Sequence, residues 1–188
     1  MRPTRLAVLV AVVLLASVAV PFLCPATAQE QQPPALPLPE MQRLAKLYTG
    51  TWNYTETYPK SPMTPNGGTN TGVYTCQLGP GGNSIFNHFH SKGAVGEFDG
   101  AMIMTWDPQA QAYKAYAFGD SFPGALVETG QWEGDALVFR TELSLPGKKL
   151  MLRNSTRFLE GGRISSDEYS SADGKPETLV VHVDAVRK

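Results

Sequence analysis

The sequence predicts an all-β protein, a roughly ten-stranded antiparallel up-and-down barrel with one short N-terminal helix. Ten short runs rich in Thr, Tyr, Val, Phe and Ile follow residue 50, and no further segment there keeps a helical period. Clusters of Gly, Pro, Asn and Asp separate the runs, and such short connections favour antiparallel neighbours. Several runs alternate apolar and polar residues, so closure into a barrel, or a two-sheet clam, removes an exposed apolar face and two raw edges.

The N-terminus has the three-part order of a secretory signal peptide. Basic residues precede an apolar stretch over residues 6–23, and a triplet of small residues follows at 26–28. This order predicts a signal peptide over residues 1–28 and export of the mature protein to the periplasm or the extracellular space. A retained membrane anchor is an alternative because the apolar stretch is just long enough to span a bilayer. A lipid anchor on Cys24 is a second alternative.

The length, charge and cysteine content of the mature chain limit its domain number, its binding partners and its disulfide bonds. Removing 28 of the 188 residues leaves 160, which is enough for one domain with a sizeable core. These residues hold 14 basic and 17 acidic side chains, so we expect no attraction to nucleic acid and, after signal cleavage, none to a membrane surface. Only Cys76 remains, which excludes an intrachain disulfide, and we expect it to be a small apolar filler of the second strand.

The mature chain begins with a predicted tether. Residues 29–39 are rich in Gln and Pro, and proline lacks a backbone donor and resists helix formation. Residues 40–188 form the predicted barrel domain. Pro39 suits the first turn of a helix, and apolar residues follow it at spacings of three, so we expect a helix that ends near Gly50.

The strands follow this helix directly. In the last run, Val181 and Val183 oppose His182 and Asp184, as in a strand with one buried face. The predicted strands span residues 51–58, 71–78, 84–91, 98–106, 112–118, 125–133, 136–143, 149–159, 163–170 and 178–187.

The first and last predicted strands carry a recognisable pair of residues. A short helix leads into Gly50-Thr51-Trp52, and Arg187 lies at the end of the last strand. This arrangement resembles the signature of the calycin barrels, the lipocalin and fatty-acid-binding-protein group, in which a basic residue of the last strand covers a Trp near the closed end. The resemblance implies this structural role for Trp52 and Arg187, and a guanidinium stacked on an indole is a favourable contact.

Within that group, the sequence resembles a bacterial family of lipocalin-like barrels of unknown function, the domain-of-unknown-function family numbered fifteen seventy-nine. The resemblance runs from about Leu44 to Lys188. Its motifs are Gly50-Thr51-Trp52, Trp106-Asp107-Pro108 with Tyr113, Gly130 and Trp132 before Gly134-Asp135, and Arg187-Lys188. These motifs are architectural, so the resemblance implies the fold rather than an activity.

Aromatic and methionine side chains that share strand faces are the candidate lining of an apolar lumen. The predicted ligand-binding residues are Tyr54, Phe86, His88, His90, Met102, Met104 and Trp106. In a fully packed small barrel they would be core residues, and alternation does not decide which face of each strand points inward. We expect non-catalytic binding of a small apolar or amphipathic molecule, with no cofactor, no metal and no catalytic residue. An interaction module displayed on the tether is a further hypothesis.

Histidines carry the alternative function, an enzyme or a metal or haem protein. His88 and His90 lie two apart on one strand face, and with His182 from another strand they could bind zinc and leave a position for water. The related nitrobindin barrels hold haem iron through a histidine on a late strand, where His182 lies. Those barrels have a Gly-rich stretch after the Gly-x-Trp, whereas residues 53–59 here contain no glycine, which disfavours haem.

Overall fold

A computed structural model describes residues 37–62, 64–120, 122–145 and 147–188 of the chain. The predicted signal peptide and residues 29–36 of the predicted tether lie outside the described residues. Among the residues described, no helix is long and apolar enough to span a bilayer.

One helix and ten strands make up the domain, as predicted. The helix α1 spans Pro39–Tyr48 and begins at the expected proline. A single 3₁₀ turn, Pro80–Gly82, lies between the second and third strands. The strands are β1 Gly50–Tyr58, β2 Gly68–Leu78, β3 Ser84–Gly93, β4 Gly96–Asp107, β5 Ala112–Gly119, β6 Phe122–Glu133, β7 Ala136–Leu145, β8 Lys148–Leu159, β9 Arg163–Ala172 and β10 Thr178–Arg187.

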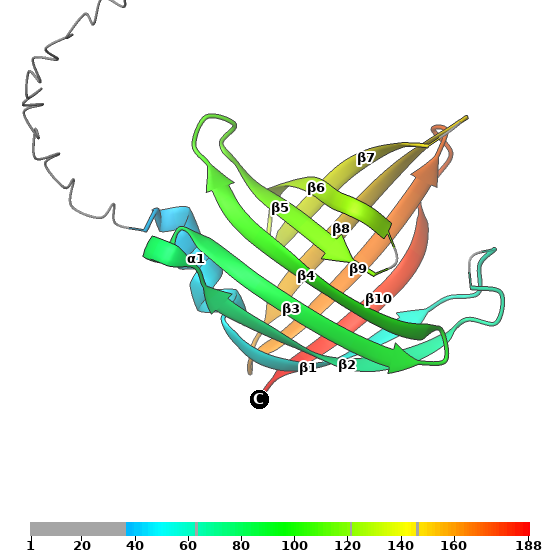
Figure 1. The fold of residues 1–188 in the computed structure, drawn as a ribbon, viewed down its shortest axis with the longest axis horizontal. Coiled ribbons are helices and arrows are strands. Elements are labelled where there is room, and N and C mark those ends of the chain that lie inside the picture. The colour runs from blue at the N-terminus through cyan, green and yellow to red at the C-terminus, as the bar shows by residue number, and fades with distance from the viewer. Residues whose placement is uncertain (1–36, 63, 121, 146) are drawn as a thin grey trace, which may run out of the picture. The chain divides into compact units, whose positions relative to one another are not determined.

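The strands close into one barrel, with α1 at one end (Figure 1). Each strand pairs antiparallel with its neighbours in sequence, and β1 pairs with β10 to complete the circle. This topology confirms the up-and-down barrel and excludes the two-sheet clam. Closure also pairs the first and last strands, which would otherwise be raw edges.

The helix closes its end of the barrel through buried apolar contacts and two hydrogen bonds. Met41 and Leu44 of α1 are both 0% exposed. The indole Nε1 of Trp52 donates to the Tyr48 carbonyl at 2.9 Å, which joins β1 to the last turn of the helix. The Arg187 guanidinium donates to the Leu47 carbonyl at 2.6 Å and lies 4.6 Å from the centre of the Trp52 ring. Both ends of the described chain are therefore held at α1.

Large side chains fill the half of the barrel nearest α1. We call this cluster of buried residues the proximal core. Its members are Met41, Leu44, Trp52, Tyr54, Tyr74, Cys76, Ile85, Met104, Tyr113, Ala115, Leu137, Phe139, Ile164 and Ala185. Cys76 is among them as a buried free thiol, in the packing role expected of it.

Aromatic rings lie against glycines of the neighbouring strand, most closely in three directly paired positions. A Cβ on Gly130 would lie 2.5 Å from the Phe139 ring, which is too close for any real side chain. The absence of a side chain therefore lets each ring lie against the barrel wall. The pairs, each in direct register, are Tyr54 with Gly72, Phe89 with Gly100 and Phe139 with Gly130.

The wall is split between β6 and β7. Only Thr129–Glu133 of β6 pairs with Ala136–Arg140 of β7, so the remainder of both strands has no ladder partner on this side. A single side-chain bond lies beyond the last rung, from the Thr141 hydroxyl to the Val127 carbonyl at 2.7 Å. The two strands diverge toward the end away from α1 (Figure 1). The seam begins next to Glu128.

Candidate functional site

The inner face of the barrel changes character away from α1. Trp52, Met104 and Leu137 are buried and point into the barrel. Because side chains alternate along a strand and paired residues share a face, every second residue of each strand, counted from these three and their cross-strand partners, also points inward. In the half away from α1 most of these side chains are only half-buried, although Asn70, Ser91 and Val181 are buried there. We call the half-buried set the distal interior. It comprises Glu56, Tyr58, Phe89, Met102, Leu126, Glu128, Leu152, Asn154, Glu168 and Val183. An inward side chain is exposed only where solvent enters the barrel, so the distal interior is open to solvent.

Three glutamates point into the distal interior. Glu56 is well partnered through one oxygen, because its Oε2 accepts from the Ser91 hydroxyl at 2.9 Å and from the Tyr58 hydroxyl at 3.0 Å. Glu128 and Glu168, in contrast, have no hydrogen-bond or ion-pair partner among the described side chains. Unpaired carboxylates inside a barrel are costly, so these two residues are the main anomaly of the inner face.

The carboxylates act on one another. Burial, followed by the negative charge of Glu168, raises the pKa of Glu128 to about 7. Burial also raises the pKa of Glu168, and the negative charge of Glu56 adds to this increase. Both effects disfavour the charged form, and no basic side chain that the structure describes offsets them. Near neutral pH, Glu128 is therefore divided between its charged and neutral forms.

A buried hydroxyl without a partner lies beside this group. Tyr54 is 6% exposed, and its ring extends across Gly72 toward Ser91. Within the described part of the chain its hydroxyl has no partner in hydrogen-bonding geometry, and the nearby Ser91 hydroxyl donates to Glu56 instead. Burial raises the pKa of Tyr54 to about 12, so this group stays a neutral phenol. An unfilled hydrogen-bonding position thus exists next to Glu56.

Of the predicted ligand-binding residues, four point inward. Tyr54 and Met104 belong to the proximal core, and Met102 lies in the distal interior. Trp106 points inward at the α1 end of β4, where it packs edge-on against Tyr113 at 4.9 Å. The sequence therefore identified wall residues of the barrel, although only Met102 belongs to its open half.

Phe86, His88 and His90 lie on the outer face, which corrects the expectation that they line the lumen. Their strand neighbours Ile85 and Ser91 are fully buried, so alternation turns these three side chains to solvent. Phe86 belongs to an apolar row of direct cross-strand partners on the outer face, largely exposed, which we call the outer row. The outer row consists of Phe86, Ile103, Tyr116 and Val127.

The three histidines do not form one site. His88 and His90 face Asp99 on β4, with the ring nitrogens 3.4 Å from its carboxylate oxygens, and both side chains are about half exposed or more. His182 lies on the outer face of β10, where Asp167 and Asp184 contact its two nitrogens at 2.7 and 3.1 Å. These acidic partners, Asp167 first, raise the pKa of His182. Because β2 and β1 lie between β3 and β10, three strand spacings, or about 14 Å, separate His182 from the other two.

This separation bears on the metal and haem hypotheses. Within the described ranges, no group of three or more His, Cys, Asp or Glu residues is arranged to hold a metal ion. A haem inside the barrel would meet none of the three imidazoles, because all of them face outward.

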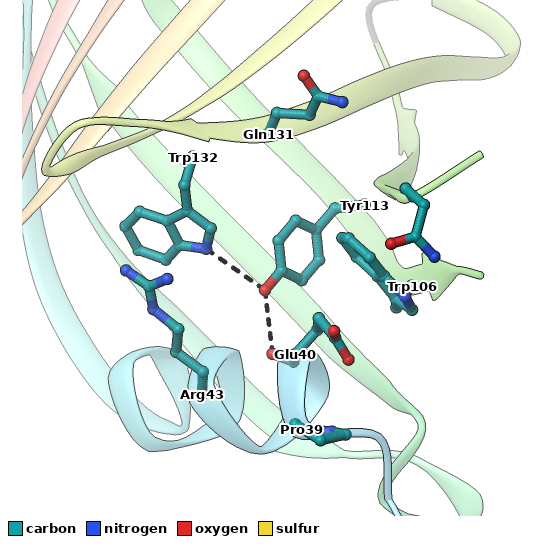
Figure 2. Close-up of a pocket in the computed structure, with 8 residues that line it drawn as sticks. Pro39, Glu40, Arg43, Trp106, Tyr113, Gln131 and Trp132 are labelled. Carbon is teal, nitrogen blue, oxygen red and sulfur yellow. Dashed lines mark hydrogen bonds between the residues drawn. The ribbon is translucent and has the colours of Figure 1, made fainter. Parts of the chain in front are cut away.

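A pocket of about 420 Å³ lies at the α1 end, between the helix and the ends of the strands that carry Trp106, Tyr113 and Trp132 (Figure 2). The Arg43 side chain stacks 3.7 Å from the centre of the Trp132 ring. The Trp132 indole donates to the Tyr113 hydroxyl at 3.4 Å, and that hydroxyl donates to the Glu40 carbonyl at 3.1 Å. These contacts fasten α1 to the barrel, so the pocket has a clear structural role. It is lined by Pro39, Glu40, Arg43, Trp106, Gln111, Tyr113, Gln131 and Trp132.

Sequence reasoning missed the inward glutamates, although a signal was present. Glu128 has the same parity as Leu126 and Gly130 along β6, so it stands where an apolar residue is expected. Glu168 likewise has the parity of buried Ile164 and Ser166 along β9. A carboxylate that interrupts an apolar face is the pattern that would have located both residues.

Comparison with known proteins supports the fold. No family model and no curated protein matches the sequence. The crystal structure of Rv2717c from M. tuberculosis is similar, with a TM-score of 0.57 and 17% sequence identity over 81% of this chain and 99% of that one. At this identity the likeness shows a shared fold alone, a calycin-like β-barrel. Membership of the family numbered fifteen seventy-nine stays a prediction.

Proposed function

We propose that this chain is an exported, non-catalytic barrel that binds a small amphipathic molecule in the distal interior. One observation carries the proposal: the inner face is mostly buried near α1 and mostly half-buried in the other half. A protein that only needed stability would gain from filling both halves, since each buried methylene contributes about 0.8 kcal/mol. The half-buried half therefore has a function other than stability.

The chemistry of the distal interior fits such a ligand. Phe89, Met102, Leu126, Leu152 and Val183 provide apolar surface on several strands. Carboxylate, amide and hydroxyl groups are interspersed among them, and small-molecule sites usually combine apolar walls with a few polar groups. The stretch where β6 and β7 are not paired is the proposed route of ligand entry.

Binding can be tested with the neutral fluorescent probe N-phenyl-1-naphthylamine. We expect saturable binding of one probe per chain, because an apolar surface open to solvent takes up such probes. Leu152→Trp should weaken binding at least tenfold because the larger ring fills the distal interior. Tyr116→Ser on the outer row is the matched control, and it should leave the affinity unchanged.

Three outcomes would locate the probe elsewhere or remove the proposal. Loss of binding in Tyr116→Ser alone would place the probe on the outer row. Loss in Trp106→Ala alone would place it in the pocket beside α1. Absence of saturable binding, together with native mass spectra that show no co-purified small molecule, would refute binding altogether. Replacing His88 and His90 with Gln should leave binding intact, because both side chains face outward.

Export has its own test. Signal cleavage predicts that the protein recovered from outside the cytoplasm begins at Gln29, which N-terminal sequencing would detect. Recovery of the protein with residues 1–28 attached would contradict the proposed cleavage.

A further inference from the structure

We infer that the ligand carries a positively charged head group, an aliphatic ammonium or a related organic cation, which sits among Glu56, Glu128 and Glu168. The inference rests on the proposed function, because it names the chemistry of the molecule bound in the same distal interior.

The first argument is that three carboxylates from separate strands project into the same half of the interior, where Glu56 acts on Glu168 and Glu168 acts on Glu128. Glu56 stands on β1 opposite Val183 of β10, and Glu168 stands on β9 opposite Val181 of that same strand. Glu128 projects from β6, and its carboxylate is close enough to Glu168 for the two charges to act on each other. Like charges in a poorly solvated space raise the free energy of the protein. A bound cation removes this cost, whereas an anionic ligand would increase it.

The second argument is the unfilled hydrogen-bonding position of Tyr54. Its hydroxyl is nine-tenths buried, has no partner and lies at the Ser91–Glu56 group. Both hydrogen bonds to Glu56 reach its Oε2, so its Oε1 accepts none. An ammonium has three donors and no acceptor, so it matches a site composed of acceptor oxygens.

The surroundings favour an organic cation over a metal ion. Among the described residues, no three potential ligands are arranged to hold a metal. The remainder of the distal interior is largely apolar, which suits the hydrocarbon part of an amphipathic amine.

Proton release gives this inference a separate signature. With a pKa of about 7, Glu128 is partly protonated at neutral pH, and a neighbouring ammonium would drive that proton off. A primary amine remains charged at this pH, since its own pKa is about 10.4. Binding of an amine should therefore release protons near pH 7, whereas binding of a neutral alcohol should release none.

The test compares decylamine, decanol and decanoate as competitors of N-phenyl-1-naphthylamine at pH 7.5. We expect decylamine to compete at least tenfold better than decanol, and decanoate to compete worse than either. The double variant Glu128→Gln, Glu168→Gln should lose at least tenfold in affinity for decylamine and keep its affinity for decanol. Glu160→Gln, an exposed glutamate after β8, is the matched control and should change neither.

The outcomes separate this inference from the proposed function. If decylamine and decanol compete equally well, the cation preference is wrong while ligand binding stands. If the double variant binds decylamine as tightly as the wild type, the glutamates do not hold the head group and the inference also fails. If the probe itself does not bind, the proposed function fails first. Calorimetry in two buffers of different ionisation enthalpy should detect the proton release, and its absence would contradict the role of Glu128.

Discussion

The two halves of the barrel interior are built from the same strands but differ in burial and in polarity. In the proximal core, Trp52 and Leu137 are 1% and 0% exposed and pack beneath α1. In the distal interior, Glu128 and Glu168 replace apolar side chains and have no described partner. The first half stabilises the fold, and the second retains groups that destabilise it. This division indicates that closure at α1 supplies enough stability for the other half to stay open.

The largest expected effect tests this division directly. Leu137→Ala should lower the free energy of unfolding by about 2–5 kcal/mol, because it leaves a cavity in a close-packed core. Leu152→Ala on the neighbouring strand should cost about 1 kcal/mol or less, because solvent already reaches that side chain. Urea denaturation of both variants measures the two costs. Equal losses would mean that the two halves do not differ in packing.

The next largest expected loss of stability comes from a side chain added at Gly130, against which the Phe139 ring packs. Gly130→Ala should cost about 1–3 kcal/mol, because the new Cβ would lie 2.5 Å from the Phe139 ring. That ring supplies all the nearest atoms, so Phe139→Leu in the same chain should recover part of the loss. A double-mutant cycle measured by denaturation gives the coupling. Strict additivity of the two changes would show that the ring does not depend on the glycine.

The strands were predictable, and their distal ends were less so. Alternation and turn residues located all ten, and the predicted last strand, 178–187, agrees with β10 in full. The prediction began β2 at residue 71, although the strand starts at Gly68, and began β6 at residue 125, although it starts at Phe122. Glycine and proline near these starts are typical of turns, but the antiparallel partner strand still extends past them.

The candidate site was less predictable because composition does not decide which face is inward. Phe86 is aromatic and points outward, whereas Glu168 is charged and points inward. Each reverses the usual preference of its residue type, and the choice depends on closure of the whole barrel. Departures of this kind are expected where function overrides packing.

Titration of Glu128 should appear as a pH dependence of stability. Its pKa is about 7 in the folded chain against an ordinary glutamate pKa of 4.5, so between these two pH values the folded state holds a proton that the unfolded state releases. Stability should therefore fall as pH rises through this window. Glu128→Gln should match the wild type near pH 4 and exceed its free energy of unfolding by up to about 3 kcal/mol at pH 8.

The difference between the wild type and Glu128→Gln reports the titration of Glu128 alone. Glu168 and His182 also have raised pKa values and lose stability in the same direction, but both are present in wild type and variant alike. Denaturation at several pH values gives the difference curve. Parallel curves from pH 4 to pH 8 would show that the Glu128 carboxyl has an ordinary pKa in the folded protein.

The smallest effect concerns the contact between Arg187 and the closed end. Arg187→Met keeps the aliphatic stem but loses the stacking on Trp52 and the hydrogen bond to Leu47. Because the guanidinium is partly solvated, we expect a loss of about 1 kcal/mol in the free energy of unfolding. Arg187→Lys keeps the charge without the planar group, so its free energy of unfolding should lie between those of the wild type and Arg187→Met.

The same variant tests whether the halves are independent. Arg187 lies at the α1 end, so its loss should not alter the affinity of the distal interior for N-phenyl-1-naphthylamine under conditions where the protein stays folded. A variant that is less stable and binds normally would show that α1 stabilises the barrel without shaping the site. A parallel loss of affinity would show instead that packing beneath α1 sets the geometry of the strands as far as Glu128.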